Sequence, residues 1–418
     1  MSTVPGHTAP GAARRARTVR SQPVDLVGSL VARLPHAADA LAWLRDGRGI
    51  VGWGEAARLE VSGPDRFVRA RDWWQALVAR AEVDDEVRAR GSGPVAFGSF
   101  AFSDDEPSLL VVPEVVLGRD GERTWLTTVG EPLRLASPEP VRATRGLRYA
   151  HGDVPVTDFR AAVARAVDLI SSGVLAKVVL ARDLVAVAED DIDVRAVLAG
   201  LTEANPDCWT YAVGGLVGAT PELLLSRAGD RVLSRVLAGT TGRGVDADED
   251  RSRVDALLHS VKNQEEHRYA VESVVDALAP HVHDLAVPDR PHALVLSNLT
   301  HLATDVTATV RDGSDVLDLL GSLHPSAAVG GTPRRAALGV IGRLEAMERG
   351  RYAGPVGWVD ANGDGEWGIA LRCAQLAGPT ARLFAGCGIV ADSDPDEEVA
   401  ETQAKLVPVR DALEGASS

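Results

Sequence analysis

Lysine is nearly absent from this chain of 418 residues. Of its 44 basic residues only three are lysines, namely Lys177, Lys262 and Lys405, and the others are arginines. A chain of this length would ordinarily contain about twenty or more lysines, because lysine is one of the common residues. Arginine stays protonated in proteins, whereas a buried lysine can lose its proton and carries a more compact charged group. The three lysines are therefore candidates for functions that arginine cannot perform, although chance survival explains any single one of them equally well.

Cysteine, long apolar runs and net positive charge are also lacking. The three cysteines, Cys208, Cys373 and Cys387, are odd in number and far apart, which argues against a disulfide framework and against a zinc site. The longest uncharged stretches, such as residues 208–221, are too short to cross a bilayer, which takes about 20 apolar residues. The net charge of -15 argues against nonspecific nucleic-acid binding but is compatible with a small anionic substrate. We therefore expect a cytoplasmic protein without nucleic-acid or membrane partners.

The pattern along the chain predicts one large α+β domain that follows a short tail. Residues 1–22 are rich in arginine and small residues but lack the apolar core of a signal peptide, so we expect a disordered tail. Residues 23–150 form the N-terminal part of the domain and residues 151–418 the C-terminal part. Strands and helices follow one another without strict βαβ alternation, which favours large antiparallel sheets over a doubly wound sheet. Periodicity and turn residues predict strands over 49–53, 95–100, 108–113, 175–187, 356–360, 367–375 and 382–385, and helices over 65–87, 157–171, 250–278, 333–348 and 395–413.

Two of these helices carry carboxylates at helical spacing. In the last helix, Glu398, Glu401 and Lys405 lie on one face, because side chains at i, i+3 and i+7 do so. In the helix over 250–278, Asn263 and Glu266 share one side. A solvated, salt-bridged surface would explain either helix alone, but two such helices together can hold Mg2+, which binds a few protein carboxylates besides water and ligand oxygens. We predict Glu266 and Glu401 as metal ligands, with Asn263 and Glu398 in the outer shell.

Three charged residues lie in apolar surroundings. Lys177 lies in the predicted strand over 175–187, and burial lowers the pKa of a lysine from about 10.4 toward neutrality, which would make it a general base. A lysine at the strand end that reaches solvent is the alternative. Glu222 precedes three leucines, where a raised pKa would let it act as an acid, although an ordinary exposed glutamate fits equally well. Arg372, in another apolar stretch, suits a bidentate clamp on a carboxylate.

Taken together, these segments resemble the chorismate-utilising enzymes and, among them, the isochorismate synthases. The resemblance covers residues 156–413 and rests on many motifs in a fixed order. These motifs are Leu175-Ala-Lys-Val-Val-Leu-Ala-Arg182, Gly218-Ala-Thr-Pro-Glu222, Leu237-Ala-Gly-Thr240, Lys262-Asn-Gln-Glu-Glu-His267, His301-Leu302, Leu323-His-Pro-Ser-Ala-Ala-Val-Gly-Gly331, Tyr352-Ala-Gly-Pro-Val-Gly357, Ala385-Gly-Cys-Gly-Ile-Val390 and Glu398-x-x-Glu-Thr-x-x-Lys405. The resemblance implies a single large α+β domain in which two large antiparallel β-sheets pack together, flanked by helices, with the catalytic part in residues 151–418.

The resemblance also implies a Mg2+-dependent conversion of chorismate to isochorismate. Lys177 would deprotonate a water that adds at ring carbon C2, and Glu222 would protonate the hydroxyl that leaves from C4. Mg2+ on Glu266 and Glu401 would neutralise and orient the ring carboxylate rather than supply a hydroxide. The substrate-binding residues implied in the same way are Gly239, Thr240, His301, Ala328, Tyr352, Arg372, Gly386, Gly388 and Lys405.

Several residues bear on the position within the family. Lys177 argues against the anthranilate-forming members, which use ammonia and a glutaminase partner, so no glutaminase subunit is expected. The segment 325–329 lacks the lysine nucleophile of some aminodeoxychorismate synthases. Ala328 stands where salicylate synthases, which also eliminate pyruvate, tend to have threonine. Asn263 replaces an acidic residue of many relatives, which weakens the case for a further carboxylate near the metal.

Two alternatives stay open, namely a salicylate synthase and a catalytically silent binding protein of the same fold. The choice between the menaquinone and the siderophore pathway is also open. A monomer is expected, because nothing in the sequence marks an interface.

Overall fold

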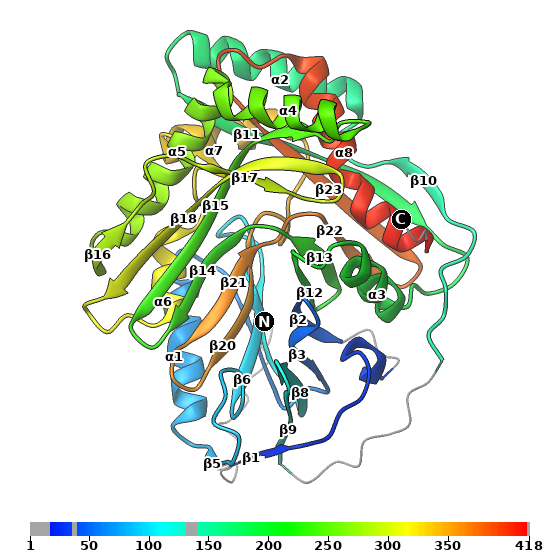
Figure 1. Ribbon diagram of the computed structural model, residues 1–418, viewed down its shortest axis with the longest axis vertical. Helices are drawn as coiled ribbons and strands as arrows, with labels where there is room; N and C mark the ends of the chain where they lie inside the picture. The colour runs from blue at the N-terminus through cyan, green and yellow to red at the C-terminus, as the bar shows by residue number, and fades with distance from the viewer. Residues whose placement is uncertain (1–16, 36–39, 131–139, 416–418) are drawn as a thin grey trace, which may run out of the picture.

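Two large β-sheets form the centre of the molecule (Figure 1). The computed structural model describes residues 17–35, 40–130 and 140–415. Among these residues all strand pairs are antiparallel except β1 with β5. The predicted single α+β domain with two large, mostly antiparallel sheets is therefore confirmed.

The first sheet contains 13 strands within the described ranges. Its order is β10 (Arg148–His151), β11 (Lys177–Val187), β23 (Thr380–Ile389), β22 (Cys373–Ala377), β13 (Leu216–Thr220), β12 (Trp209–Val213), β2 (Leu41–Arg45), β3 (Arg48–Trp53), β8 (Val115–Asp120), β9 (Arg123–Val129), β1 (Thr18–Pro23) and β5 (Glu82–Asp85), with β19 (Gly331–Thr332) beside β11.

The second sheet contains ten strands in the same part of the chain. Its order is β16 (Val282–Ala286), β18 (Leu299–Val310), β15 (Arg231–Gly242), β14 (Leu223–Ala228), β21 (Gly365–Ile369), β20 (Pro355–Asp360), β6 (Val95–Ser99), β7 (Ser108–Val112) and β4 (Ala57–Val61), with β17 (His292–Val295) beside β18. Each sheet joins strands from both halves of the sequence, because β2 pairs with β12 and β6 pairs with β20. The parts before and after residue 150 are thus built into the same two sheets.

Helices flank these sheets. They are α1 (Arg66–Val78), α2 (Val156–Ser171), α3 (Val194–Ala204), α4 (Ala247–His259), α5 (Val261–Leu278), α6 (Val316–Leu323), α7 (Arg334–Leu344) and α8 (Pro395–Glu414), and a 3-10 turn spans Val31–Arg33. Helices α2, α4, α5 and α7 gather at the upper end in Figure 1, and α8 runs beside β23. None of the described helices is long and apolar enough to cross a membrane.

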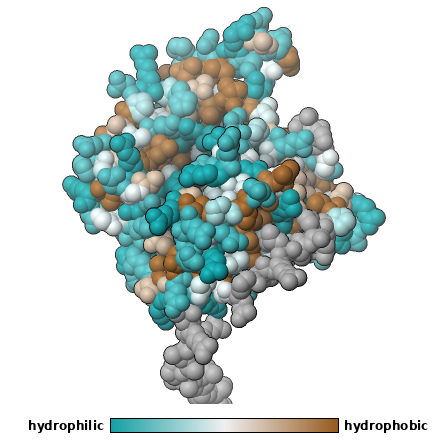
Figure 2. All heavy atoms as spheres, turned by 60° about the horizontal axis from the view of Figure 1, so that its bottom comes forward, coloured by the Kyte–Doolittle hydropathy of each residue, from teal (hydrophilic) through white to brown (hydrophobic). Residues whose placement is uncertain are grey.

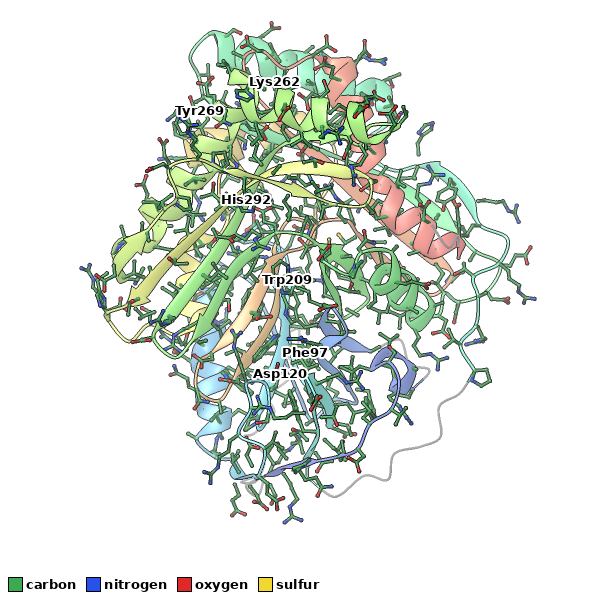
Figure 3. All side chains as sticks on the ribbon, in the orientation of Figure 1. Phe97, Asp120, Trp209, Lys262, Tyr269 and His292 are labelled. Atoms are coloured by element: carbon green, nitrogen blue, oxygen red, sulfur yellow. The ribbon has the colours of Figure 1, made fainter. Side chains whose placement is uncertain are left out.

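The apolar side chains fill the space between and behind the sheets. Phe97 on β6 is fully buried and lies deep among the strands, whereas Lys262 lies among the helices at the upper end (Figure 3). On the face shown in Figure 2, hydrophilic side chains cover most of the surface and hydrophobic ones form small groups between them. The cysteines Cys208, Cys373 and Cys387 are all buried and free, as their spacing predicted.

Several predicted boundaries are wrong. Residues 18–22 of the expected tail belong to β1, which pairs with β5 and β9, while residues 1–16 lie outside the described ranges. The helix expected over 65–87 ends at Val78, and the chain continues into β5. The helix expected over 333–348 ends at Leu344. The strand expected over 382–385 is longer, because β23 runs on through Gly386 and Gly388 to Ile389.

Two interruptions inside predicted elements have identifiable causes. The helix expected over 250–278 is two helices, because Ser260 has extended backbone angles and its hydroxyl caps α5 by accepting a hydrogen bond from the backbone N–H of Asn263. The strand expected over 367–375 is likewise two strands, β21 and β22. Between them Arg372 has a φ of 48°, in the left-handed region that no continuous strand contains.

Candidate active site

Strand β11 brings Lys177 into the interior next to helix α5. The side chain is fully buried, which excludes a lysine that reaches solvent from the strand end. Its ammonium nitrogen lies 3.3 Å from Oε1 of Glu266 on α5. A charge buried in this way is costly unless it is paired, so Glu266 is what makes the position tolerable.

The other two lysines also form ion pairs with glutamates, namely with two of those that we predicted to surround the metal ion. The ammonium of Lys262 lies 3.0 Å from Oε1 of Glu398, and that of Lys405 lies 2.5 Å from Oε1 of Glu401. Each lysine of the chain therefore meets at least one carboxylate of helices α5 and α8, and Lys262 also lies 3.8 Å from Oε2 of Glu397. The scarce residue is concentrated in one cluster.

Glycines in β23 make room for this cluster. A Cβ atom on Gly388 would lie 2.0 Å from Oε1 of Glu266, so only glycine lets that carboxylate approach the strand. A Cβ atom on Gly386 would lie 2.9 Å from the hydroxyl of Tyr352. The two glycines are two residues apart and face the same side of the sheet. Between Glu266 and Tyr352, strand β23 therefore exposes only backbone atoms to the pocket.

The carboxylates fit a hard divalent cation with few protein ligands. Among the described residues there is no group of three or more His, Cys, Asp or Glu side chains arranged to hold a metal. Burial and the neighbouring Glu401 raise the pKa of Glu398, and its partner Lys262 opposes this. A donor set of Glu266 and Glu401 leaves several positions for water and substrate oxygens, as Mg2+ prefers.

Asn263 has a structural task in this region. Its side-chain amide donates to the hydroxyl of Ser260 at 2.9 Å, and its Cβ and Oδ1 lie against Gly239, 3.1 Å from where a Cβ atom there would be. His267 on the same helix is buried and bonds to the carbonyl of Ala238 and the hydroxyl of Thr304.

Glu222 lies between β13 and β14 and is almost completely buried. Burial raises the pKa of Glu222 to about 8, while the backbone N–H of Leu237 and the charges of Lys177, Lys405 and Arg372 act in the opposite direction. The carboxyl is therefore protonated at neutral pH and can donate a proton.

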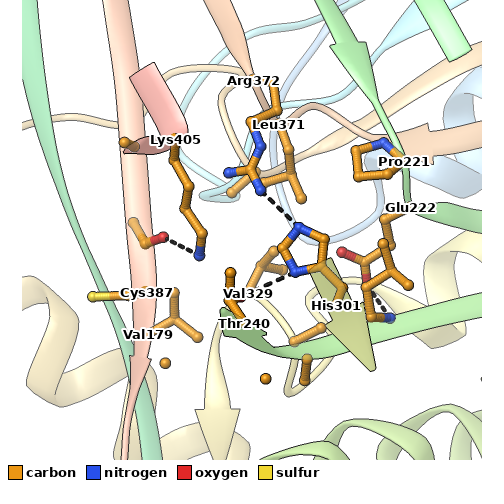
Figure 4. Close-up of a pocket in the computed structure, with 18 of the residues that line it drawn as sticks. Val179, Pro221, Glu222, Thr240, His301, Val329, Leu371, Arg372, Cys387 and Lys405 are labelled. Atoms are coloured by element: carbon orange, nitrogen blue, oxygen red, sulfur yellow. Dashed lines mark hydrogen bonds between the residues drawn. The ribbon is translucent and has the colours of Figure 1, made fainter. Parts of the chain in front are cut away.

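Arg372, His301 and Thr240 form a hydrogen-bonded line on the wall of the pocket (Figure 4). Arg372 is buried, and its guanidinium lies 3.0 Å from Nε2 of His301. On the other side of the ring, Nδ1 lies 3.0 Å from the hydroxyl oxygen of Thr240. Nearby, the ammonium of Lys405 donates to the carbonyl of Gly386 at 2.9 Å, so two cations face this side of the pocket.

These residues line one pocket with a cavity volume of about 60 Å³. The predicted site residues found in its wall are Glu222, Gly239, Thr240, Glu266, His301, Ala328, Tyr352, Arg372, Gly386, Gly388 and Lys405. Lys177 and Glu401 lie behind this wall through their contacts with Glu266 and Lys405. Asn263 and Glu398 are not in the wall either, although Asn263 lies against Gly239.

Sequence reasoning missed the apolar part of the wall. It comprises Val179, Pro221, Leu237, Ala238, Val329, Ala353, Leu371, Phe384, Ala385 and Cys387. A signal existed for two of them, because Val179 is two residues from Lys177 and Phe384 alternates with Gly386 and Gly388, so they share a strand face. Phe384 stacks on Tyr352 with ring centres 5.1 Å apart, which fixes the tyrosine ring.

Known proteins share this architecture and sequence. The salicylate biosynthesis isochorismate synthase of Pseudomonas aeruginosa is 37% identical over 405 residues, covering 89% of this chain and 84% of that protein. The isochorismate synthase MenF of Bacillus subtilis is 32% identical over 402 residues, covering 88% and 85%. The structure of MenF, the menaquinone-specific isochorismate synthase of Escherichia coli, matches with a TM-score of 0.80 at 25% identity and covers 96% of this chain and 95% of that chain.

The family described as chorismate binding enzyme has a sequence model that matches residues 18–131 and 135–414, nearly the whole chain. That match includes every residue of the pocket. It also covers the N-terminal strands, where the sequence alone gave no specific motif. The chain therefore belongs to the chorismate binding enzyme family and is an enzyme.

Proposed function

We propose that this enzyme is a Mg2+-dependent isochorismate synthase. The observation that carries the proposal is that one cationic pocket has both a fully buried lysine, Lys177, behind its wall and a buried, protonated Glu222 in its wall. A lysine that can serve as a base and a carboxyl that can serve as an acid suit a reaction that removes a proton from one oxygen and adds a proton to another.

The two groups fit the water addition and hydroxyl loss of the isochorismate reaction. Lys177 accepts a proton from a water molecule, whose oxygen bonds to ring carbon C2. The ring double bonds shift, the bond between C4 and its hydroxyl oxygen breaks, and Glu222 protonates that oxygen so that it leaves as water. One water is consumed and one is released, so the product is an isomer of chorismate.

Chorismate carries two carboxylates, and the pocket offers cations to both. Arg372 and Lys405 suit the enolpyruvyl carboxylate, beside the ring of Tyr352 and the backbone of Gly386. Glu266 and Glu401 would hold Mg2+, which when bound would neutralise the ring carboxylate and take over the charge of Glu266 that otherwise pairs with Lys177.

A salicylate synthase is the second candidate function. Against it stands Ala328, which lines the pocket and presents only a methyl group where a hydroxyl would be expected for that activity. The named relatives support the first candidate, because each is called an isochorismate synthase.

Product analysis tests the proposal. Purified enzyme incubated with chorismate and Mg2+ should form isochorismate, resolved by liquid chromatography, with no pyruvate detected by lactate dehydrogenase coupling. Release of salicylate and pyruvate without an added lyase would establish the second candidate instead. No turnover at all would favour a silent binding protein.

A charge-conserving variant tests the base. Lys177→Arg keeps a positive charge beside Glu266 but replaces a group that can lose its proton by one that does not. We expect turnover to fall by roughly 10²–10⁴-fold, the usual contribution of a general base. Arg160→Lys is the matched control, because Arg160 is exposed and pairs with Asp396 far from the pocket. Retained turnover in Lys177→Arg would refute the assigned base.

A further inference from the structure

Strand β15 contains a bulge at the pocket. The pairing of β15 with β18 shifts register between Ala238 and Thr240, and Gly239 between them has a φ of 79°. Bulges of this kind change the direction in which the neighbouring side chains point. Here the shift sets Thr240 opposite His301, and both line the pocket (Figure 4).

The contact with Arg372 decides which nitrogen of His301 carries the proton. A guanidinium can only donate hydrogen bonds, so Nε2 of His301, 3.0 Å from Nη2 of Arg372, must be the acceptor. The ring is also neutral, because burial and the charges of Arg372 and Lys405 hold the pKa of His301 well below its usual range. A neutral ring that accepts at Nε2 carries its single proton on Nδ1.

The proton on Nδ1 fixes the role of the Thr240 hydroxyl in turn. Nδ1 lies 3.0 Å from that hydroxyl oxygen, which therefore accepts a hydrogen bond from the histidine. The hydroxyl has one hydrogen of its own, and among the described residues the ring of His301 is the one hydrogen-bond partner of the Thr240 side chain. Because Thr240 lines the pocket, that hydrogen is available to a bound molecule.

We propose that Arg372, His301 and Thr240 form a one-directional chain of donors that makes the Thr240 hydroxyl a dedicated donor to a substrate carboxylate. His301 is then a positioning residue, and Thr240 touches the substrate. This inference rests on the proposed function for the identity of the substrate. A carboxylate oxygen, which only accepts hydrogen bonds, can bind the hydrogen of the Thr240 hydroxyl. A substrate hydroxyl or amide that points its own hydrogen at Thr240 would find a donor there instead of an acceptor.

The backbone conformation and burial of Arg372 are consistent with a fixed hydrogen bond to His301. The residue has a left-handed backbone at φ 48° and is buried, a combination that costs energy and occurs at functional positions. A flexible arginine could instead turn its guanidinium toward other acceptors. The turn between β21 and β22 thus aims this cation at His301.

Nitrogen NMR of the enzyme with labelled histidines tests the tautomer directly, without substrate. His301 should show a protonated Nδ1 and an unprotonated Nε2, and its signals are identified by their loss in His301→Phe. An Nε2-protonated ring or a doubly protonated ring would overturn the chain. Because the free enzyme is measured, this result does not depend on whether chorismate is the substrate.

Steady-state kinetics test the donor. Thr240→Val removes the hydroxyl at nearly constant shape and should raise the KM for chorismate roughly 10- to 100-fold, as for a lost hydrogen bond to a charged group, with a smaller change in kcat. Thr240→Ser, which keeps the hydroxyl, should stay within about threefold of the parent. An unchanged KM in Thr240→Val would overturn the proposal. A parent enzyme that does not convert chorismate would refute the proposed function, and the tautomer would still decide the chain.

Discussion

At the scale of single residues, burial and charge pairing determine the chemistry of the pocket. Lys177 and Glu222 are both buried, but Lys177 has Glu266 as a partner at 3.3 Å, whereas Glu222 has a single long contact to a backbone N–H at 3.5 Å. Burial without a strong partner favours the uncharged form of an acid, which is why the pKa of Glu222 is raised. The two buried groups therefore differ in the partners that surround them.

The pKa of Glu222 gives a prediction for the pH dependence of both activity and stability. Because its pKa is about 8, turnover should fall as pH rises above about 8 and the acid loses its proton. The folded protein also keeps a proton that the unfolded chain releases near the ordinary pKa of 4.5, so this group's contribution to stability is lost as pH rises from about 4.5 to about 8.

Glu222→Gln separates these two effects. It should lower turnover by roughly 10²–10⁴-fold, and its Tm should rise relative to the parent between about pH 5 and pH 8, because glutamine has no proton to lose. Thermal unfolding and initial rates over this range are the measurements, with the exposed Glu60→Gln as control. A Tm difference that does not change with pH would contradict the raised pKa.

Gly388 predicts a steric effect on the metal site. In Gly388→Ala the new methyl group would lie 2.0 Å from Oε1 of Glu266, so that carboxylate has to move away from β23. We expect the Mg2+ concentration for half-maximal turnover to rise about tenfold or more, roughly the effect of losing 1.4 kcal/mol. Gly342→Ala in α7 is the control, because nothing lies within 4 Å of its added Cβ atom. Equal Mg2+ titrations of the two variants would argue against Glu266 as a ligand.

At the scale of elements, helices α5 and α8 meet through the pair of Lys262 and Glu398. Glu398 is almost completely buried, and Lys262 is the cation that neutralises its charge. Burial alone would lower the pKa of Lys262, but the charge and hydrogen bond of Glu398 raise it. The pair joins the helix that carries Glu266 to the helix that carries Glu401.

Removing the side chain of Lys262 should therefore shift helices α5 and α8 relative to each other. Lys262→Met leaves Glu398 buried beside Glu401 without a partner, and we expect weaker Mg2+ dependence of both turnover and Tm. Adding Glu398→Gln in the same chain should restore part of the effect, because the unpaired charge is gone. Arg268→Met is the control on α5, since Arg268 is exposed and its ion pair is with Glu272 rather than with a carboxylate of α8. No difference between Lys262→Met and the control would refute the link.

Elements with strong local signals could be predicted from the sequence, and interruptions could not. Helix α8 begins at Pro395 as expected, because Asp394 caps it and its side chain accepts hydrogen bonds from the backbone. The apolar run that contains Arg372 looks continuous in the sequence, which does not show the left-handed turn at φ 48° that divides it into two strands. The site motifs predicted the polar residues of the pocket wall. That Phe384 and Leu371 also line the pocket could be seen only in the folded structure.

At the scale of the whole molecule, the ion pair of Glu345 and Arg349 connects the two sheets. On the edge of β11 that faces away from β23, no strand of the described residues pairs with it between β19 and β10, and there its backbone bonds to this pair. Glu345 accepts from the N–H of Ala181 at 2.8 Å, and Arg349 donates to the carbonyl of Val179 at 2.8 Å. The pair thus takes the place of a missing strand beside the base.

Arg349 also contacts a residue next to the second sheet and a residue of the pocket wall. Its guanidinium donates to the carbonyl of Val329 at 2.9 Å and lies over the ring of Phe102, 4.1 Å from the ring centre. Phe102 follows β6 of the second sheet, and Val329 lines the pocket. Both members of the pair are buried, with side-chain exposures of 2% for Arg349 and 3% for Glu345. Loss of one member would leave the other charge without compensation.

We expect Arg349→Met to lower the free energy of unfolding by about 3–5 kcal/mol, the usual cost of breaking a buried pair. The double change Arg349→Met with Glu345→Gln should recover part of this loss, because the isolated carboxylate is removed. Urea unfolding followed by circular dichroism measures both, and Arg268→Met, an exposed pair worth about 0–1 kcal/mol, is the control. If Arg349→Met unfolds like that control, the pair does not hold the two sheets together and contributes only to the local shape of β11.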